Sequence, residues 1–449
     1  MWITAKSRGV RSHALGVLDQ VLFSTGALIL GVLLARWLDQ ASYGEFTLAS
    51  ALILFLGGLY NALIIEPMSI LGPARHDGVP HSYFVTLVLI HLALSGCLLG
   101  VVVLGLAVAQ SAGIVRIVGV SANIFLLAST VVTPSMMLFW LIRRRAYAMF
   151  TVARALRSTV TYVAVLLSGV AMLGWAQALT LSRSLWILVI AALLGSLVDT
   201  WSSLPALASG RVLVRARREV WTVLRQHWTY GSWAVLASVM YWGNGNLYYY
   251  LTGSLVGLSG VATLRVVAVC LQPVRTIQAG VVNVLLPTLA AARKAHDGHQ
   301  AFKRHVAGAV VLFVALTVTY ATLLAMSSAW VLRLLYGGRY DDAAVYVPIL
   351  AVGAVIDSLG EAAAVGLKAL EEPRLICVGY AIGSVATLII GIPAIGALGT
   401  LGAAYAAVGS SIAFAVSVWL MYRARARREI AVSRPAGLRE GSAFGNVEM

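Results

Sequence analysis

Charged residues are scarce in this sequence. Only 11% of its 449 residues are Asp, Glu, Lys or Arg, against about 25% in an ordinary globular protein. The apolar set AVILMFWYC makes up 60% of the chain, so too little polar surface remains to cover a water-soluble particle. A set of soluble domains is therefore excluded, and the composition predicts an integral membrane protein whose solvent is lipid.

Other absences narrow the class further. The three cysteines, Cys97, Cys270 and Cys377, lie singly in apolar runs, so no structural disulfide is expected. No GxxxxGK(S/T) phosphate-binding loop occurs, and no histidine or cysteine cluster has the spacing of a metal site. The loop near 327–343 is the longest on its side of the membrane, and it is too short to fold into a catalytic domain. These absences exclude an ATPase and disfavour a membrane enzyme.

Apolar runs of about 20 residues, the length that spans a bilayer as a helix, recur along the chain. They predict an all-α integral membrane protein with both ends of the chain on the same side. The expected spans are 14–37, 45–68, 83–109, 118–141, 150–172, 179–200, 229–252, 260–287, 306–327, 344–367, 375–395 and 399–421, which makes twelve.

Lysine and arginine are distributed unevenly between the two sides of the membrane. Of the 33, 26 fall on the side that carries the chain ends, five fall on the other side, and Arg265 and Arg275 lie inside a span. Because positive residues accumulate in cytoplasmic segments, both termini are predicted to be cytoplasmic. Membrane topology thus accounts for the net charge of +16, and no nucleic-acid partner is expected.

The longest segment on the inner side, 201–228, divides the chain into two halves of six spans with the same orientation. Such halves are typical of transporters built from parallel repeats. The expected organisation is a cytoplasmic N-terminus, a six-helix bundle, a cytoplasmic linker, a second six-helix bundle and a disordered cytoplasmic tail, at 1–13, 14–200, 201–228, 229–421 and 422–449.

Short motifs support a family resemblance over about 1–425. They are Asp19-Gln20, Ala35-Arg36-Trp37-Leu38 and Tyr43-Gly44-Glu45-Phe46 in the first half, then Leu335-Tyr336-Gly337-Gly338-Arg339-Tyr340 and Gly399-Thr400-Leu401-Gly402-Ala403-Ala404 in the second. In these residues the sequence resembles the multidrug/oligosaccharidyl-lipid/polysaccharide (MOP) exporter superfamily, and within it the bacterial polysaccharide flippase branch. The resemblance implies two V-related, MATE-like helical bundles around a central cavity, working by alternating access.

The same resemblance implies a function at the bacterial inner membrane. The expected cargo is an undecaprenyl-pyrophosphate-linked oligosaccharide repeat unit, moved to the outer leaflet for exopolysaccharide or O-antigen synthesis without any bond change. Expected partners are this glycan and the lipid bilayer, with a polysaccharide polymerase and chain-length proteins as further candidates; no cofactor is expected beyond a coupling H+ or Na+. The main alternative is a cation-coupled multidrug exporter of the same superfamily, and a membrane polysaccharide polymerase or ligase is disfavoured.

Polar residues in the eighth expected span form the strongest candidate binding site. Arginine donates bidentate hydrogen bonds to phosphate, and an ionisable residue at membrane depth costs at least about 2.5–3.5 kcal/mol, which makes each one a functional candidate. Helical spacing places most of this set on one stripe, with Gln278 its least secure member. The stripe is interpreted as facing the cavity, with pairing of Arg275 to Asp357 as the structural alternative; its members are Arg265, Gln272, Arg275 and Gln278.

Three carboxylates are candidates for ion coupling. Asp357 and Glu361 are four residues apart, hence on one face of the tenth span, where charge pairing with the eighth span is the alternative role. Asp19 lies in the inner third of the first span, where a partner arginine or solvation at the helix end would also explain it. The deep charges are of mixed sign, so electrostatics alone does not choose between an anionic and a cationic cargo.

The seventh span contains Trp242-Gly243-Asn244-Gly245-Asn246 followed by three tyrosines, Tyr248 to Tyr250. The glycines and asparagines are expected to loosen this helix, which membrane depth tolerates only beside protein or water. Asn244 and Asn246 are predicted either to bind sugar hydroxyls or to form a bend used in gating. The tyrosines are interpreted as an aromatic belt at the outer interface.

Overall fold

The computed structural model describes residues 2–75, 79–111, 116–117, 120–203, 205, 209–293 and 298–433. Within these ranges, eleven helices are long and apolar enough to cross a membrane, which makes the chain a multi-pass membrane protein. The seventh expected span, 229–252, is not among these eleven and forms the second half of a longer helix, α10 (Gly210–Leu255). Its asparagine, serine, glycine and tyrosine side chains lower its hydropathy.

The first half of the chain forms one bundle. Its long helices are α1 (Trp2–Trp37), α2 (Gln40–Tyr60), α4 (His81–Ser111), α6 (Thr133–Ala148), α7 (Val152–Trp175) and α8 (Leu181–Thr200). Two of them extend through π-helical turns into shorter helices: η1 (Asn61–Ile65) joins α2 to α3 (Glu66–Arg75), and η2 (Ala128–Val132) joins α5 (Ala122–Leu127) to α6. The strands β1 (Arg116–Ile117) and β2 (Val120–Ser121) pair antiparallel before α5, and η3 (Trp201–Ser203) follows α8.

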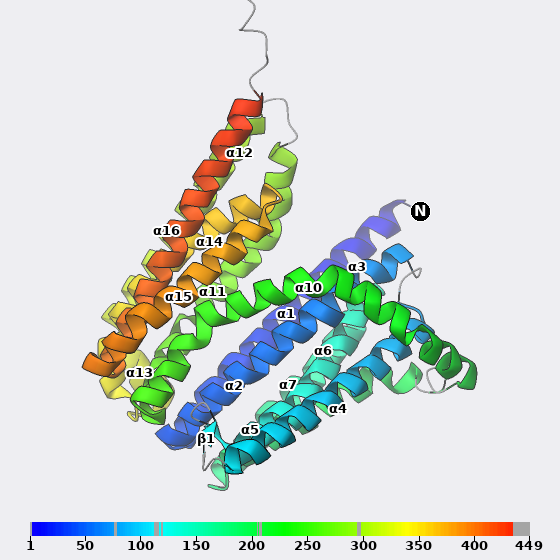
Figure 1. The fold of residues 1–449 in the computed structure, drawn as a ribbon, viewed down its shortest axis with the longest axis horizontal. Coiled ribbons are helices and arrows are strands. Elements are labelled where there is room, and N and C mark those ends of the chain that lie inside the picture. The colour runs from blue at the N-terminus through cyan, green and yellow to red at the C-terminus, as the bar shows by residue number, and fades with distance from the viewer. Residues whose placement is uncertain are drawn as a thin grey trace, which may run out of the picture.

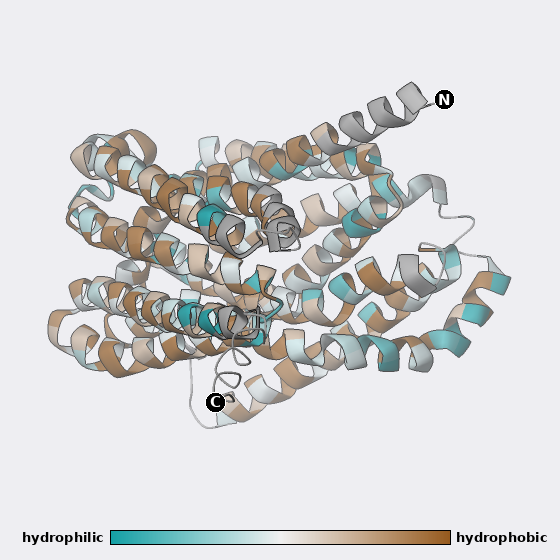
Figure 2. Ribbon diagram, turned by 90° about the horizontal axis from the view of Figure 1, so that it is seen from above, coloured by the Kyte–Doolittle hydropathy of each residue, from teal (hydrophilic) through white to brown (hydrophobic). Residues whose placement is uncertain are grey.

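The second half forms the other bundle. It contains α10, α11 (Leu258–Arg293), α12 (Gly298–Met326), α13 (Ser328–Tyr336), η4 (Asp341–Val345), α14 (Tyr346–Ala369), α15 (Pro373–Leu398) and α16 (Thr400–Ser433). Figure 1 shows the two bundles meeting at one end and diverging toward the end where α1 begins and α16 ends. Along most helices hydrophobic residues predominate, as a lipid solvent requires (Figure 2).

Glycines in the family-like motifs allow close contacts between helices and a tight turn. A Cβ at Gly44 would lie only 1.9 Å from the Leu258 carbonyl oxygen, so glycine lets α2 touch the start of α11. A Cβ at Gly402 would likewise lie 1.9 Å from the Ala394 carbonyl oxygen, which sets the tight contact of α16 with α15. Gly337 has φ 66° and ends α13 in a left-handed turn. These motifs are therefore packing and turn motifs.

One cluster of buried apolar side chains continues across the junction. It includes Leu34 of α1, Leu48 of α2, Val267 of α11 and Tyr336 of α13, all at most 2% exposed. At the start of α2, the Asp39 carboxylate accepts a hydrogen bond of 2.9 Å from the Ser42 amide and caps the helix. Hydrogen bonds from Ser42 lower the pKa of Asp39, so it carries its charge at the positive end of α2.

Local structure departs from the expectations at three places. Residues 210–228, assigned to the cytoplasmic linker 201–228, form the first half of α10. The tail is helical as far as Ser433, and its remainder lies outside the described residues. The glycines and asparagines at 243–246 do not interrupt α10, because Gly243 packs against α15, where a Cβ would lie 2.8 Å from the Ser384 hydroxyl oxygen.

Candidate functional site

A cavity of about 1180 Å³ lies on the inner face of the second bundle. Its walls come from α10, α11, α12, α14, α15 and α16, and among the described residues of the first bundle only Glu66 of α3 contributes to the lining. The sequence predicted a cavity shared by two halves, whereas the structure places nearly all of the lining in one half. The charged lining residues are Glu66, Arg265, Arg275, Asp357, Glu361, Lys368 and Arg374.

The polar stripe of α11 faces this cavity. Arg265, Gln272, Arg275 and Gln278 all line it, as the helical spacing predicted. Gln278 is the most restricted of the four, since its side-chain amide donates a 2.7 Å hydrogen bond to the Thr317 hydroxyl of α12 and it is 9% exposed. Arg265 and Arg275 therefore supply the positive charges of the stripe that face the cavity, and Gln272 supplies the side-chain amide that is open to it.

Arg265 occupies the end of the cavity nearest the junction of the bundles. Its guanidinium interacts with the side chains of Tyr43 of α2 and Tyr249 of α10. In the described chain no carboxylate forms an ion pair with it. A half-buried cation that meets phenol groups but, in the described chain, no carboxylate is poorly compensated, so this position favours an anionic group in the cavity.

Arg275 is held differently. Its Nη2 lies 3.2 Å from Asp357 Oδ2 on α14, and the two side chains are 55% and 29% exposed toward the cavity. An ion pair this open contributes about 0–1 kcal/mol, so it does not lock either residue. Both sequence interpretations of Arg275 are thus realised together: it lines the cavity and pairs with Asp357.

Glu361 lies one helical turn after Asp357, on the same face of α14, and also lines the cavity. It accepts a 3.3 Å hydrogen bond from the Tyr380 hydroxyl of α15 and interacts electrostatically with Lys368. In the described residues it forms no ion pair with an α11 arginine. The two carboxylates predicted to act together therefore have different partners.

The second half of α10 supplies neutral polar groups. Asn244 and Asn246 both line the cavity; the Asn244 side-chain oxygen accepts a bond from the Ser410 hydroxyl, and the Asn246 amide donates to its own helix at Trp242. Tyr248 and Tyr249 line the cavity as well. Their assignment to an outer aromatic belt was wrong, because α10 turns this face inward, toward Arg265.

Asp19 lies apart from these residues, inside the first bundle. It is fully buried, and its Oδ2 accepts hydrogen bonds from Arg143 Nε at 2.9 Å and from the Tyr147 hydroxyl of the same helix, α6. The other carboxylate oxygen has no hydrogen-bond partner in the described residues. A smaller cavity of about 370 Å³ lies beside this pair, lined by Gln20, Asn61 and Arg144 among others. The partner arginine considered for Asp19 is thus present.

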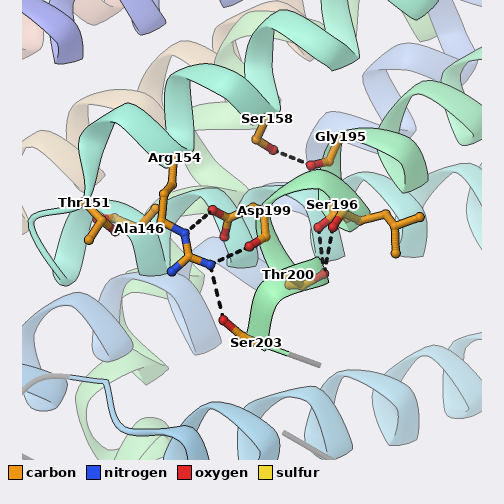
Figure 3. A network of polar contacts seen from close by, with 10 residues as sticks. Ala146, Thr151, Arg154, Ser158, Gly195, Ser196, Asp199, Thr200 and Ser203 are labelled. Atoms are coloured by element: carbon orange, nitrogen blue, oxygen red, sulfur yellow. Dashed lines mark hydrogen bonds and ion pairs between the residues drawn. The ribbon is translucent and has the colours of Figure 1, made fainter. Parts of the chain in front are cut away.

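The inner end of the first bundle carries a second ion pair outside the large cavity. Arg154 Nε donates to Asp199 Oδ1 at 3.0 Å, and its Nη2 reaches the Ser203 hydroxyl at 3.3 Å, which joins α7 to α8 and η3 (Figure 3). In the structure this arginine fastens two helices of one bundle.

Several cavity residues were not recognised in the sequence. Lys368 and Arg374 flank the turn between α14 and α15, and Trp233 of α10 lies under the Arg374 guanidinium, 5.0 Å from it to the ring centroid. Glu66 accepts a 3.4 Å bond from the Tyr230 hydroxyl. The sequence explains charged residues at helix ends by membrane topology or by contact with water. The path of α10 brings these side chains together in the lining of the cavity.

The sequence matches no protein-family model and no curated protein. The fold does match solved structures, at 12–14% identity. One is a multidrug resistance MATE family transporter of the MOP superfamily in an inward-facing conformation, with a TM-score of 0.74 and 12% identity, covering 92% of this chain and 96% of that one.

Two further structures show the same likeness. The lipid II flippase MurJ, in an inward closed conformation, gives a TM-score of 0.67 at 14% identity, covering 94% of this chain and 90% of that one. A MOP superfamily transporter from Pyrococcus furiosus, whose binding pocket is described as of reverse polarity, gives 0.59 at 12% identity over 96% of both chains. The two-bundle, MATE-like fold predicted from the motifs is confirmed.

Proposed function

We propose that this protein is a transporter of the MOP superfamily that moves undecaprenyl-pyrophosphate-linked oligosaccharide repeat units across the bacterial inner membrane by alternating access. The observation that carries the proposal is Arg265, a cation without a carboxylate partner in the described chain, facing a cavity of about 1180 Å³. The fold shared with a lipid II flippase supports it.

The chemistry of the cargo fits the lining of the cavity. A diphosphate needs fixed cations, and Arg265 supplies one at the closed end, with Arg275 the second candidate. A glycan needs neutral donors and acceptors, which Asn244, Asn246 and Gln272 offer. Tyrosine and tryptophan rings on α10 add flat apolar surface against which sugar rings pack. A cation without a carboxylate partner in the described chain, with neutral amides lining the same cavity, suits a lipid headgroup that carries both a diphosphate and a sugar.

The distribution of basic residues supports an orientation in the membrane. With both chain ends in the cytoplasm, the end where the two bundles diverge faces inward. The present state is then the one that accepts cargo from the cytoplasmic leaflet. In this scheme Asp19, Asp357 and Glu361 are the candidates for coupling transport to H+ or Na+. A polysaccharide polymerase and chain-length proteins are the proposed downstream partners.

A cation-coupled multidrug exporter is the second candidate function. It is favoured by Asp357 and Glu361, two carboxylates in the same cavity, and by the fold shared with a multidrug resistance transporter. A cationic drug would pair with Glu361, which in the described chain forms no ion pair with arginine. The two functions therefore assign opposite ends of the cavity to the cargo's charged group.

Reconstituted transport distinguishes the two functions. Purified protein in proteoliposomes is given a fluorescent undecaprenyl-pyrophosphate disaccharide in both leaflets, and a membrane-impermeant enzyme that cleaves the exposed headgroup reports its movement. We expect the protein to accelerate exchange between leaflets, while an ion gradient drives no uptake of a cationic dye. Dye uptake without exchange of the lipid would establish the exporter and reject the flippase. In cells, loss of the gene should trap the lipid-linked oligosaccharide on the inner leaflet.

A further inference from the structure

The first half of α10, residues 210–228, is a helical segment that crosses the end of the first bundle before the chain enters the second. Figure 1 shows α10 bending strongly: its first half lies across the α4 end of the bundle, and its second half runs beside α2 toward the junction. A Cβ at Gly231 would lie 2.4 Å from the Ala62 carbonyl oxygen, so glycine lets α10 pass closely over η1 at this bend.

One face of this segment is fixed to the protein. Ala216, Val223 and His227 are at most 2% exposed. The Thr86 hydroxyl of α4 donates to the Ala216 carbonyl oxygen at 3.2 Å, and the His227 ring contacts the Tyr83 hydroxyl at 2.8 Å and the Leu63 carbonyl oxygen at 2.9 Å. The orientation of the helix about its own axis is therefore set, and the opposite face must point away from the bundle.

That opposite face carries a regular pattern of basic and apolar residues. Arg211, Arg218 and Arg225 recur every seven residues, and so do Val214, Trp221 and Trp228. At 100° per residue the two rows lie side by side, roughly opposite the buried face. All six residues are exposed; Val214, Trp221 and Trp228 reach 54%, 74% and 60%. In Figure 2 this part of α10 lies at the edge of the molecule.

The pattern has no partner within the described chain. Of the arginines in this segment, only Arg215 forms an ion pair there, with Glu219 at 2.8 Å. If this face met only water, Val214, Trp221 and Trp228 would form an apolar patch left unburied. In the headgroup layer of a membrane, tryptophan rings sit between lipid chains and water, while arginines bind phosphates.

We propose that the exposed face of residues 211–228 lies in the headgroup layer and binds anionic phospholipid, such as phosphatidylglycerol, through Arg211, Arg218 and Arg225. The tryptophan row inserts beside the acyl chains, and the arginine row bonds the phosphates. Charge complementarity selects an anionic lipid, and continuity of this helix with membrane-spanning elements places the face at the bilayer surface. This site is separate from the transport cavity, so it holds whichever cargo the cavity takes.

The test is lipid binding to the full-length protein in mild detergent, measured by native mass spectrometry while phosphatidylglycerol or phosphatidylcholine is titrated. A basic residue at a membrane surface contributes about a fivefold preference for anionic lipid. We therefore expect R211Q/R218Q/R225Q to lower the affinity for phosphatidylglycerol by roughly 100-fold and to leave the affinity for phosphatidylcholine unchanged. R215Q is the matched control, because Arg215 is already neutralised by Glu219, and it should bind as the wild type does.

Two outcomes would overturn the proposal. Wild-type binding of phosphatidylglycerol by the triple variant would mean that the face meets a protein partner or water. Equal loss of both lipids would mean that packing rather than charge was changed. The single variant R218Q, with an expected loss of about fivefold, serves as the second measurement if the triple variant unfolds. Failure here leaves the flippase experiment unaffected, because that one reports on the cavity.

Discussion

Arg339, in the loop before α14, donates a 2.7 Å hydrogen bond from Nη1 to the backbone carbonyl oxygen of Leu38, 301 positions earlier in the chain. The Gln40 side-chain amide returns a bond of 3.0 Å to the Arg339 carbonyl oxygen. These bonds tie the loop after α1 to the second bundle at the end where the bundles meet. If the protein works by alternating access as proposed, this junction separates when the cavity opens to the opposite side, and the bonds then favour the present state.

We expect Arg339→Ala to shift the equilibrium toward the state open at the junction by about fivefold, because a hydrogen bond of this kind contributes about 1 kcal/mol. A cysteine at Ala268, which lines the cavity, reports the change in a chain whose native cysteines are replaced by serine. Its rate of labelling by a membrane-impermeant thiol reagent, added from the side away from the chain ends, should rise.

The control for this experiment is Arg333→Ala. Arg333 pairs with Asp341 at 2.7 Å within the same bundle, so its removal leaves the junction intact. Equal labelling rates in the Arg333 and Arg339 variants would show that the bond to Leu38 has no part in the equilibrium.

Arg265→Ala is expected to lower the rate of lipid-linked oligosaccharide exchange by about 10- to 100-fold, since a hydrogen bond to a charged group contributes about 1.5–3 kcal/mol. Arg265→Lys should recover only part of the rate, because lysine keeps the charge but loses the fork that holds two phosphate oxygens. The measurement is headgroup exchange in proteoliposomes, with insertion verified by protease mapping. A fully active alanine variant would remove Arg265 from the cargo site.

The Arg275–Asp357 pair offers a separate test of cargo charge. Asp357→Asn frees the Arg275 guanidinium, so undecaprenyl pyrophosphate should bind about fivefold more tightly if Arg275 contacts the phosphate. Glu361→Gln, on the same face but hydrogen-bonded to Tyr380, is the matched control. Binding is measured by fluorescence titration of the purified protein. Weaker binding in Asp357→Asn would indicate that the pair only holds α11 against α14.

Asp19 requires a paired design, because its removal leaves Arg143, 12% exposed, without a carboxylate partner in the described residues. Breaking a buried ion pair costs about 3–5 kcal/mol, so Asp19→Asn alone should unfold at a lower temperature. Asp19→Asn with Arg143→Gln removes both charges and should regain much of this stability. If Asp19 couples an ion to transport, the double variant folds but transports without dependence on H+ or Na+. An unchanged ion dependence would leave Asp19 with a structural role only.

The sequence predicted the spans and the α11 stripe well because both depend on local information. The free energy of transferring about 20 apolar residues into lipid is a sum of contributions from residues that are adjacent in the chain. The facing of Arg265, Gln272 and Arg275 follows from helical periodicity alone. The partners of these residues could not be predicted in the same way, since no local pattern indicates that Arg265 meets Tyr43 from the other half.

The role of α10 was the largest error, for a definite physical reason. Residues 210–228 are too charged to span a membrane, so they were assigned to a linker, although their seven-residue spacing is that of an amphipathic helix. Glycines at 243 and 245 suggested a break, but a close neighbour in α15 favours glycine at 243 and the cavity leaves open space beside 245. At such positions tertiary packing outweighs the low intrinsic helix propensity of glycine.

The amino-acid sequence by itself determined that this chain is an integral membrane protein, where most of its apolar helices lie, and which face of α11 is polar, because hydration and helical geometry act residue by residue. The tertiary structure alone decided that one bundle supplies nearly the whole cavity, that Asp19 is neutralised by Arg143, and that Lys368 and Arg374 gather at its opening. Those outcomes depend on how helices cross, which is set by contacts between residues distant in the chain.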